Sequence, residues 1–407
     1  MKKWFRNIGP ATLITAAFIG PGTVTLCSIA GVNFGYNLLW AMLLSVIATL
    51  ILQEMAARLG IITQKGLSEV LRQEIKNPIF KILSIFLIIF AIVLGNAAYE
   101  AGNISGGVLG LSAVFPVQNL NFWGLSINYL SIILGILAFL ILISGNYKVL
   151  ERSLIVLVLL MSISFLITAI ITKPDLLAVL KGLFVPSFPE KSLLTIIGLI
   201  GTTVVPYNLF LHASLVKEKW NKASDLPLAR KDTLYAVLIG GLVSVSIIIS
   251  ASASNVESVK NVMDLAEGLV PLYGSIAKYF LALGLFAAGI TSAITAPLAA
   301  AYVVKGMLGW QEGLGSKKFK AVWIFILLLG VLFSSMGFKP IEIIRVAQIA
   351  NGILLPVITG FLLWIMNKKD VLGKYSNNLI QNLSGFIILG IVIFLGLKSV
   401  WKVLETF

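Results

Sequence analysis

Residues 17–25 read Ala-Phe-Ile-Gly-Pro-Gly-Thr-Val-Thr, and residues 201–212 read Gly-Thr-Thr-Val-Val-Pro-Tyr-Asn-Leu-Phe-Leu-His. Each stretch places a proline inside an apolar segment long enough to cross a bilayer. A proline removes one backbone donor and clashes with the carbonyl four residues earlier, so each segment is predicted to be interrupted at mid-membrane depth. One such proline would predict only a kink, but two at matching positions predict a pair of interrupted helices.

Eleven apolar segments of membrane-spanning length include these two stretches. A helix needs about 20 residues to cross the hydrocarbon core, and such segments cover residues 10–32, 37–59, 80–110, 126–144, 150–172, 193–216, 233–253, 273–308, 320–337, 342–366 and 380–402. Of the 407 residues, 58% are hydrophobic and only 12% are charged, against about 25% charged in globular proteins. A soluble enzyme is therefore excluded. We predict an all-α integral membrane protein with 11 transmembrane helices.

The two interrupted segments are the first and the sixth, five spans apart. Because five is odd, a second unit with the same helix order enters the membrane from the opposite side, as in inverted-repeat transporters that bind substrate near the midplane. The third and eighth segments, both rich in small residues, stand in the same relation. We expect one transmembrane domain over residues 1–407, with repeats over about 10–172 and 193–366 and an extra helix over about 380–402.

Lysine and arginine are distributed unevenly between the connections. If the N-terminus is cytoplasmic, 22 of the 31 lie in cytoplasmic segments, and the outer connections 33–36 and 111–125 carry none. Cytoplasmic loops are enriched in these residues, so we expect a multi-pass protein of the cell membrane with a cytoplasmic N-terminus and an external C-terminus. The same distribution explains the formal charge of +14, so the lipid bilayer is the expected partner and nucleic acid is not.

At its two proline motifs the chain resembles the Nramp (natural resistance-associated macrophage protein) family of proton-coupled divalent metal transporters. The family carries Asp-Pro-Gly-Asn in span one and Met-Pro-His-Asn-Leu, then Leu-His-Ser, in span six. The corresponding strings here are Gly-Pro-Gly-Thr at 20–23, Val-Pro-Tyr-Asn-Leu at 205–209 and Leu-His-Ala at 211–213. The resemblance covers nearly the whole chain and implies the leucine-transporter fold, with two inverted five-helix repeats plus one helix, and metal-cation transport by alternating access.

The chain resembles a divergent member of the family, because the positions of the usual metal ligands differ. The family's Asp, Asn and Met ligands correspond to Gly20, Thr23 and Val205, none of which is a comparable ligand for a soft transition metal. Which residues would ligate a metal therefore stays open. The neutral groups near the two breaks form the expected substrate-binding set: Gly20, Pro21, Gly22, Thr23, Val205, Pro206, Tyr207, Asn208 and Gln348.

Two titratable residues match positions that the family places on its proton route. Glu100 lies deep in the third span, where an ionisable group is usually functional because its isolated burial is costly. His212 is the only histidine in the chain, and histidine changes charge near neutral pH. A structural hydrogen bond for Glu100 and simple packing for His212 are the alternatives. Glu54 lies four residues before Arg58, which favours an ion pair within one helix.

Several functions remain compatible with the sequence. A transporter of a metal cation, coupled to protons, comes first because of the resemblance. The alternative is transport of a small organic solute such as an amino acid, since the positive end of a half-helix at a neutral Gly-Pro-Gly break could bind a carboxylate. A non-transporting receptor would require a site closed by apolar residues. An enzyme is least expected, because no Ser/His/Asp arrangement or Gly-rich phosphate loop is present. We expect no cofactor and no obligate protein partner.

Overall fold

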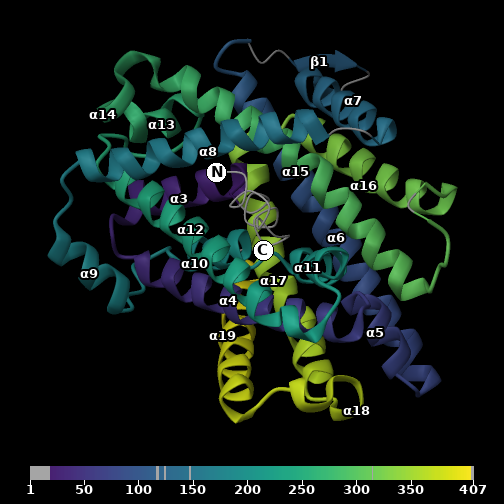
Figure 1. The fold of residues 1–407 in the computed structure, drawn as a ribbon. Helices are drawn as coiled ribbons and strands as arrows, with labels where there is room; N and C mark the ends of the chain where they lie inside the picture. The colour runs from purple at the N-terminus through teal and green to yellow at the C-terminus, as the bar shows by residue number, and fades with distance from the viewer. Residues whose placement is uncertain (1–18, 116–118, 123–124, 146–147, 314, 405–407) are drawn as a thin grey trace.

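The computed structural model describes residues 19–404 except 116–118, 123–124, 146–147 and 314 (Figure 1). Among these residues, nine helices are long and apolar enough to cross a membrane, judged by length and composition. Each of the eleven predicted spans overlaps at least one helix, but the described helices of the first and fourth spans, Pro21–Phe34 and Tyr129–Ser144, have only 14 and 16 residues. Residues 10–18 of the first predicted span lie outside the described part of the chain.

The long helices follow the predicted spans in chain order. They are α3 (Pro21–Phe34), α4 (Leu39–Thr63), α6 (Pro78–Leu111), α7 (Tyr129–Ser144), α8 (Lys148–Ile171), α10 (Leu193–Thr203), α11 (Pro206–Lys219), α12 (Leu226–Ser252), α15 (Ala277–Leu308), α16 (Lys317–Ser335), α17 (Pro340–Met366) and α19 (Leu379–Leu404). The sixth predicted span is thus divided between α10 and α11.

Short elements fill the connections between the long helices. They are α5 (Leu67–Glu74), α9 (Leu176–Phe184), α13 (Val262–Ala266), α14 (Val270–Tyr273), α18 (Lys369–Leu372) and an antiparallel hairpin of β1 (Asn119–Phe122) and β2 (Leu125–Asn128). Figure 1 shows the hairpin, α13 and α14 at one end of the molecule and α18 at the opposite end. This placement agrees with the alternation of connections between the two sides of a membrane.

The two longest helices, α6 and α15, correspond to the third and eighth predicted spans and pack against each other. Small residues allow this close approach. A Cβ atom on Gly289 of α15 would lie 2.6 Å from the backbone nitrogen of Gly107 of α6, so a larger side chain would push the helices apart. Because α16 and α17 also pack on α6, its second half, from Gly95 onwards, is almost entirely buried, while its first half is largely exposed.

A buried arginine fastens the end of α4 to the connection before α19. Arg58 pairs with Glu54 at 3.2 Å, and this structure confirms the ion pair predicted within one helix. The Arg58 guanidinium also donates to the Tyr375 carbonyl at 2.8 Å and to Asn377 Oδ1 at 2.7 Å. Arg230 of α12 reaches the same Glu54 carboxylate at 2.8 Å. The connection between α17 and α19 is therefore held against α4 by charge-assisted hydrogen bonds.

Candidate functional site

The interruption of the sixth span lies immediately before its proline. Val204 and Val205 are non-helical, and α11 begins at Pro206. In the first span, the chain bends at Ile19 and Gly20, and α3 begins at Pro21. From the two proline motifs the sequence predicts non-helical backbone over residues 20–23 and 205–208. This prediction is correct for Gly20 and Val205 and wrong for 21–23 and 206–208, which are helical. The physical reason is that a proline at the first helical position removes no hydrogen bond, because that amide has no partner within the helix.

The break in the sixth span places two helix ends of opposite polarity next to each other. The last carbonyls of α10 carry a partial negative charge, and the first amides of α11 carry a partial positive charge. In a continuous helix the Thr202 carbonyl would accept from residue 206, but Pro206 has no N–H group. A cation is therefore attracted to the end of α10, and an anionic group to the start of α11.

Three glycines bring α3, α6, α10 and α17 into direct contact at the breaks. A Cβ atom on Gly22 would overlap the Gln348 side chain, and a Cβ atom on Gly201 would overlap the Gln348 carbonyl oxygen. A Cβ atom on Gly106 of α6 would overlap the Pro21 ring. The Gly-Pro-Gly motif at the start of α3, the end of α10 and Gln348 of α17 therefore share one site.

Two side-chain contacts also connect the helices at this site. Thr23 Oγ1 and Thr202 Oγ1 lie 2.9 Å apart, which links the first turn of α3 to the last turn of α10. The Tyr207 ring packs edge-on against the Tyr99 ring of α6, with centroids 5.4 Å apart. Of the predicted substrate-binding residues, Gly22 and Gln348 therefore lie next to each other, Thr23 contacts the end of α10, and Tyr207 packs on α6. They are buried, with Thr23, Tyr207, Asn208 and Gln348 each exposing at most 1% of their surface.

Several residues of α11 and α17 carry buried polar atoms without a hydrogen-bond partner. Within the described residues they include both amide atoms of Asn208, Gln348 Oε1 and Asn351 Nδ2. Each such atom costs about 1–3 kcal/mol in an apolar interior, so a native site that keeps several of them is suited to a polar ligand or to water. Sequence reasoning missed Asn351, although its spacing of three residues from Gln348 places both on one face of a helix.

Glu100 belongs to α6, and its side chain packs against α16. A Cβ atom on Gly330 of α16 would overlap the Glu100 side chain, so this glycine provides the space that the carboxyl group occupies. Glu100 Oε2 accepts from Asn103 Nδ2 at 3.4 Å, and Glu100 Oε1 has no partner among the described residues. The carboxyl group is fully buried within a membrane-spanning helix.

His212 of α11 faces a different helix. Its Nδ1 atom lies 2.7 Å from Gln53 Oε1 of α4, and its Nε2 atom has no partner in the described part of the chain. Because an amide oxygen only accepts, the Nδ1 atom donates this hydrogen bond, and in the neutral imidazole the Nε2 atom carries the lone pair. Sequence reasoning missed Gln53, although a buried amide in an apolar span is itself a signal of function.

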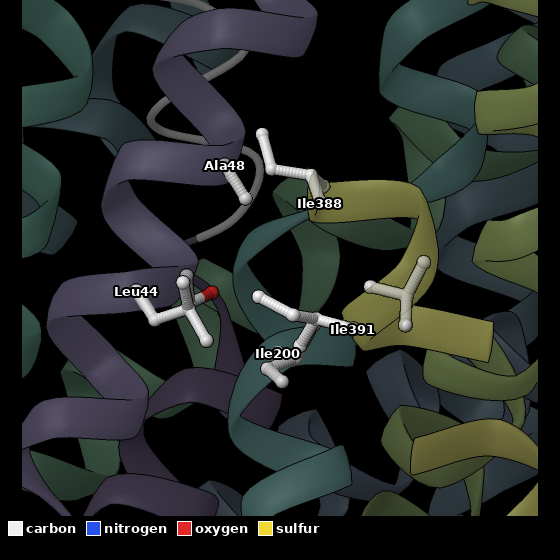
Figure 2. A pocket seen from close by; sticks show the side chains of 7 residues that line it. Leu44, Ala48, Ile200, Ile388 and Ile391 are labelled. Atoms are coloured by element: carbon white, nitrogen blue, oxygen red, sulfur yellow. The ribbon is translucent and has the colours of Figure 1, made fainter. Parts of the chain in front are cut away.

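Figure 2 shows a crevice on another side of α10, and its lining is almost entirely apolar. It lies between α4, α10 and α19 and is lined by Leu44, Ser45, Ala48, Ile200, Ile388, Ile391 and Val392. None of the predicted substrate-binding residues lines it. No group of three or more His, Cys, Asp or Glu that could hold a metal occurs in the parts of the chain that the structure describes.

We expect Gly201→Ala to destabilise the protein strongly, because the new methyl group would overlap backbone atoms of α17 that cannot rotate away. Overpacking of this kind costs about 1–3 kcal/mol and occasionally more. Gly360→Ala is the matched control, since a Cβ atom there meets nothing within 4 Å. Thermal unfolding of the purified proteins in detergent measures both. Equal melting temperatures of the two variants would contradict the contact between α10 and α17.

The sequence is similar over most of its length to one family of known proteins. The profile of the family described as "Natural resistance-associated macrophage protein-like" matches residues 11–402. The divalent metal cation transporter MntH of Bacillus subtilis is 29% identical over 384 residues, covering 91% of this chain and 86% of that protein. The MntH protein of Verminephrobacter eiseniae is 26% identical over 379 residues, covering 91% of this chain and 83% of its own length.

Solved structures of other proteins have a fold similar to that of this chain. A manganese transporter of Eremococcus coleocola superimposes with a TM-score of 0.75 at 18% identity, covering 97% of this chain and 87% of that one. Mhp1, a nucleobase-cation-symport-1 family transporter, superimposes with a TM-score of 0.55 at 16% identity, covering 98% and 93%.

Proposed function

Because the chain belongs to the Nramp family, we propose that it is a secondary-active transporter that moves a divalent metal cation across a membrane by alternating access. It has the leucine-transporter fold of its structural neighbours, with two inverted five-helix repeats plus one helix. Its curated relatives are named as transporters rather than enzymes, and their names favour a metal over the organic solute.

The observation that carries this proposal is the set of unpartnered polar atoms beside the end of α10. Asn208 and Gln348 offer amide oxygens, and the last turn of α10 adds backbone carbonyls. Oxygen donors of this kind suit a hard divalent cation. Since the substrate-binding set from Gly20 to Gln348 contains no carboxylate, the cation keeps part of its hydration shell and binds more weakly than it would to a charged site.

We extend the proposal to the repeats and the proton route. The proposed repeats cover about 10–172 and 193–366. This division is supported by α6 and α15, which form the third span of each repeat and have similar lengths. Glu100 and His212 are the proposed proton-carrying residues, since each is buried and leaves one titratable atom without a partner among the described residues.

Uptake into liposomes tests the substrate class. We expect manganese or magnesium to accumulate, or to compete for uptake, and an amino-acid panel to do neither. Asn208→Ala is the informative variant, because both amide atoms of Asn208 lack partners and the substitution removes no hydrogen bond. It should reduce transport while leaving the melting temperature nearly unchanged. The proposal would be overturned if the protein took up an amino acid and took up neither manganese nor magnesium.

A second asparagine provides a matched control for this experiment. Asn96 is also buried in the membrane domain, but its Nδ2 atom donates to the Ala296 carbonyl at 3.0 Å. Asn96→Ala should therefore lower stability by about 0.5–1.5 kcal/mol, because it removes a buried hydrogen bond. Equal losses of stability in Asn208→Ala and Asn96→Ala would contradict a ligand-binding role for Asn208.

The proposed orientation predicts which side of the membrane each connection faces. In a Cys27→Ala background, which removes the only cysteine, we expect Asn221→Cys to be labelled only after the cytoplasmic side is opened. Val114→Cys should react with an impermeant maleimide added to intact cells, because the connection 111–125 is external and Val114 is exposed. Reversed accessibility of the two positions would contradict the charge argument.

A further inference from the structure

The short helix α9 exposes an apolar face. Leu176, Leu177, Leu180 and Phe184 are 71%, 78%, 52% and 69% exposed, and Gly182 on the opposite side is buried. The spacing of the four exposed residues places them together on one side of a helix. In a water-soluble connection this side would be polar, so its composition requires an apolar environment.

The opposite side of α9 is fixed to the turn between α3 and α4. A Cβ atom on Gly182 would overlap the Tyr36 carbonyl oxygen. Just beyond α9, the Trp40 indole donates to the Ser187 carbonyl at 3.0 Å, and the Ser187 hydroxyl donates to the Asn37 carbonyl at 3.0 Å. The direction in which the apolar face points is therefore set by contacts with the rest of the protein.

The position of α9 along the chain indicates what covers this face. Four residues separate α9 from the end of α8, whose exposed side chains include Ile163, Ile167 and Ile170 and form a lipid-facing surface. The Asp175 side chain caps α9 by accepting from the first amides, and Lys181 lies exposed at the edge of the apolar face. Figure 1 shows α9 at the margin of the molecule. Apolar residues bordered by charges are typical of a helix at the membrane surface.

We propose that α9 is an interfacial helix whose apolar face lies in the lipid of the leaflet at which α8 ends. The face continues the lipid-contacting surface of α8, and it lies about 5–10 Å into the boundary between headgroups and acyl chains. Lys181 extends its ammonium group from the edge of the face towards the headgroups. Through the contacts of Gly182 with Tyr36 and of Ser187 with Asn37 and Trp40, the lipid-bound helix and the segment after it hold the α3–α4 turn at a fixed depth. This inference is independent of the transported substrate.

Site-directed spin labelling tests the proposal in the full-length protein in liposomes. In the Cys27→Ala background, nitroxides are attached at Leu177→Cys, Leu180→Cys and Phe184→Cys, all at exposed positions that tolerate a label. Ile163→Cys on α8 is the lipid control, and Glu257→Cys in the connection before α13 is the aqueous control. We expect collisions with oxygen to be frequent at the three α9 positions. Collisions with a water-soluble nickel chelate should be several-fold rarer there than at Glu257→Cys.

Two results would overturn the proposal. Accessibilities equal to those of Glu257→Cys would place the apolar face in water. Strong dipolar broadening between labels on two copies, removed by dilution with unlabelled protein, would show that a second copy of the chain covers the face. A Lys181→Cys label adds an internal check, because this position should be more accessible to the nickel chelate than its neighbour Leu180→Cys.

Discussion

The combined substitutions Gly20→Asp, Thr23→Asn and Val205→Met are expected to give the protein tight manganese binding, with Kd lowered by about a hundredfold, or about 3 kcal/mol. They restore the three ligand types that the Nramp resemblance places around the metal. A carboxylate in a partly dehydrated site attracts a divalent cation far more strongly than in water. The backbone accommodates the change, because Gly20 is the N-cap of α3, where aspartate is among the preferred residues.

Isothermal titration with manganese and cadmium measures this gain. The matched control carries Gly20→Asn with the same two other substitutions, so the difference between the two variants isolates the charge of the carboxylate. Thr23→Asn removes the contact with Thr202 in both proteins, and its effect therefore cancels. If the parent protein bound manganese as tightly as the Asp variant, the inference that its uncharged site binds the cation weakly would be wrong. A folded Asp variant that binds no metal would mean that the site has been reshaped for another substrate.

Glu100→Gln is expected to abolish the pH dependence of uptake while leaving the fold intact. Glutamine fills the space beside Gly330 and keeps an oxygen that accepts from Asn103, but it cannot carry a proton. If protons drive transport, uptake by the parent rises as the external pH falls, and uptake by the variant stays flat. Uptake into liposomes with a fixed internal pH and a series of external pH values measures both profiles.

Two further variants give this experiment its controls. Glu54→Gln removes a carboxylate that pairs with Arg58 and Arg230 at the end of α4, so it should change stability and leave the pH profile unchanged. His212→Gln tests the second proposed proton carrier. Identical flat profiles for Glu100→Gln and His212→Gln would indicate one relay, although the two side chains pack against different helices. A Glu100→Gln variant that keeps the parental profile and melts early would make Glu100 a structural residue.

The spans and the pairing of the two interrupted helices could be predicted because they depend on local properties. Hydropathy over about 20 residues defines a span without knowledge of its neighbours. The position of the break within the motif was predicted less well. Proline disrupts the residues before it and is favoured at the start of a helix, so Pro206 begins α11 instead of extending the non-helical stretch.

The partners of the site residues could not be predicted, because tertiary packing alone brings them together. Thr23 and Thr202 are 179 residues apart, and Gln53 and His212 are 159 apart. No periodicity within one helix indicates such pairs. The closeness of Gly22 to Gln348 likewise depends on how α3 and α17 cross.

The bonding of Arg58 has a consequence for how the chain is assembled during synthesis. Its acceptors Tyr375 and Asn377 are 317 and 319 residues further along the chain. At about 5–20 residues per second, the ribosome reaches them roughly 15–60 s after it has made Arg58. During that time the Glu54 carboxylate, four residues earlier in the same helix, is the partner of the guanidinium, and the N–H groups that later bond Tyr375 and Asn377 are satisfied by water or lipid phosphate. The end of α4 at Arg58 therefore reaches its final place late in biogenesis, when the segment around α19 is being translated.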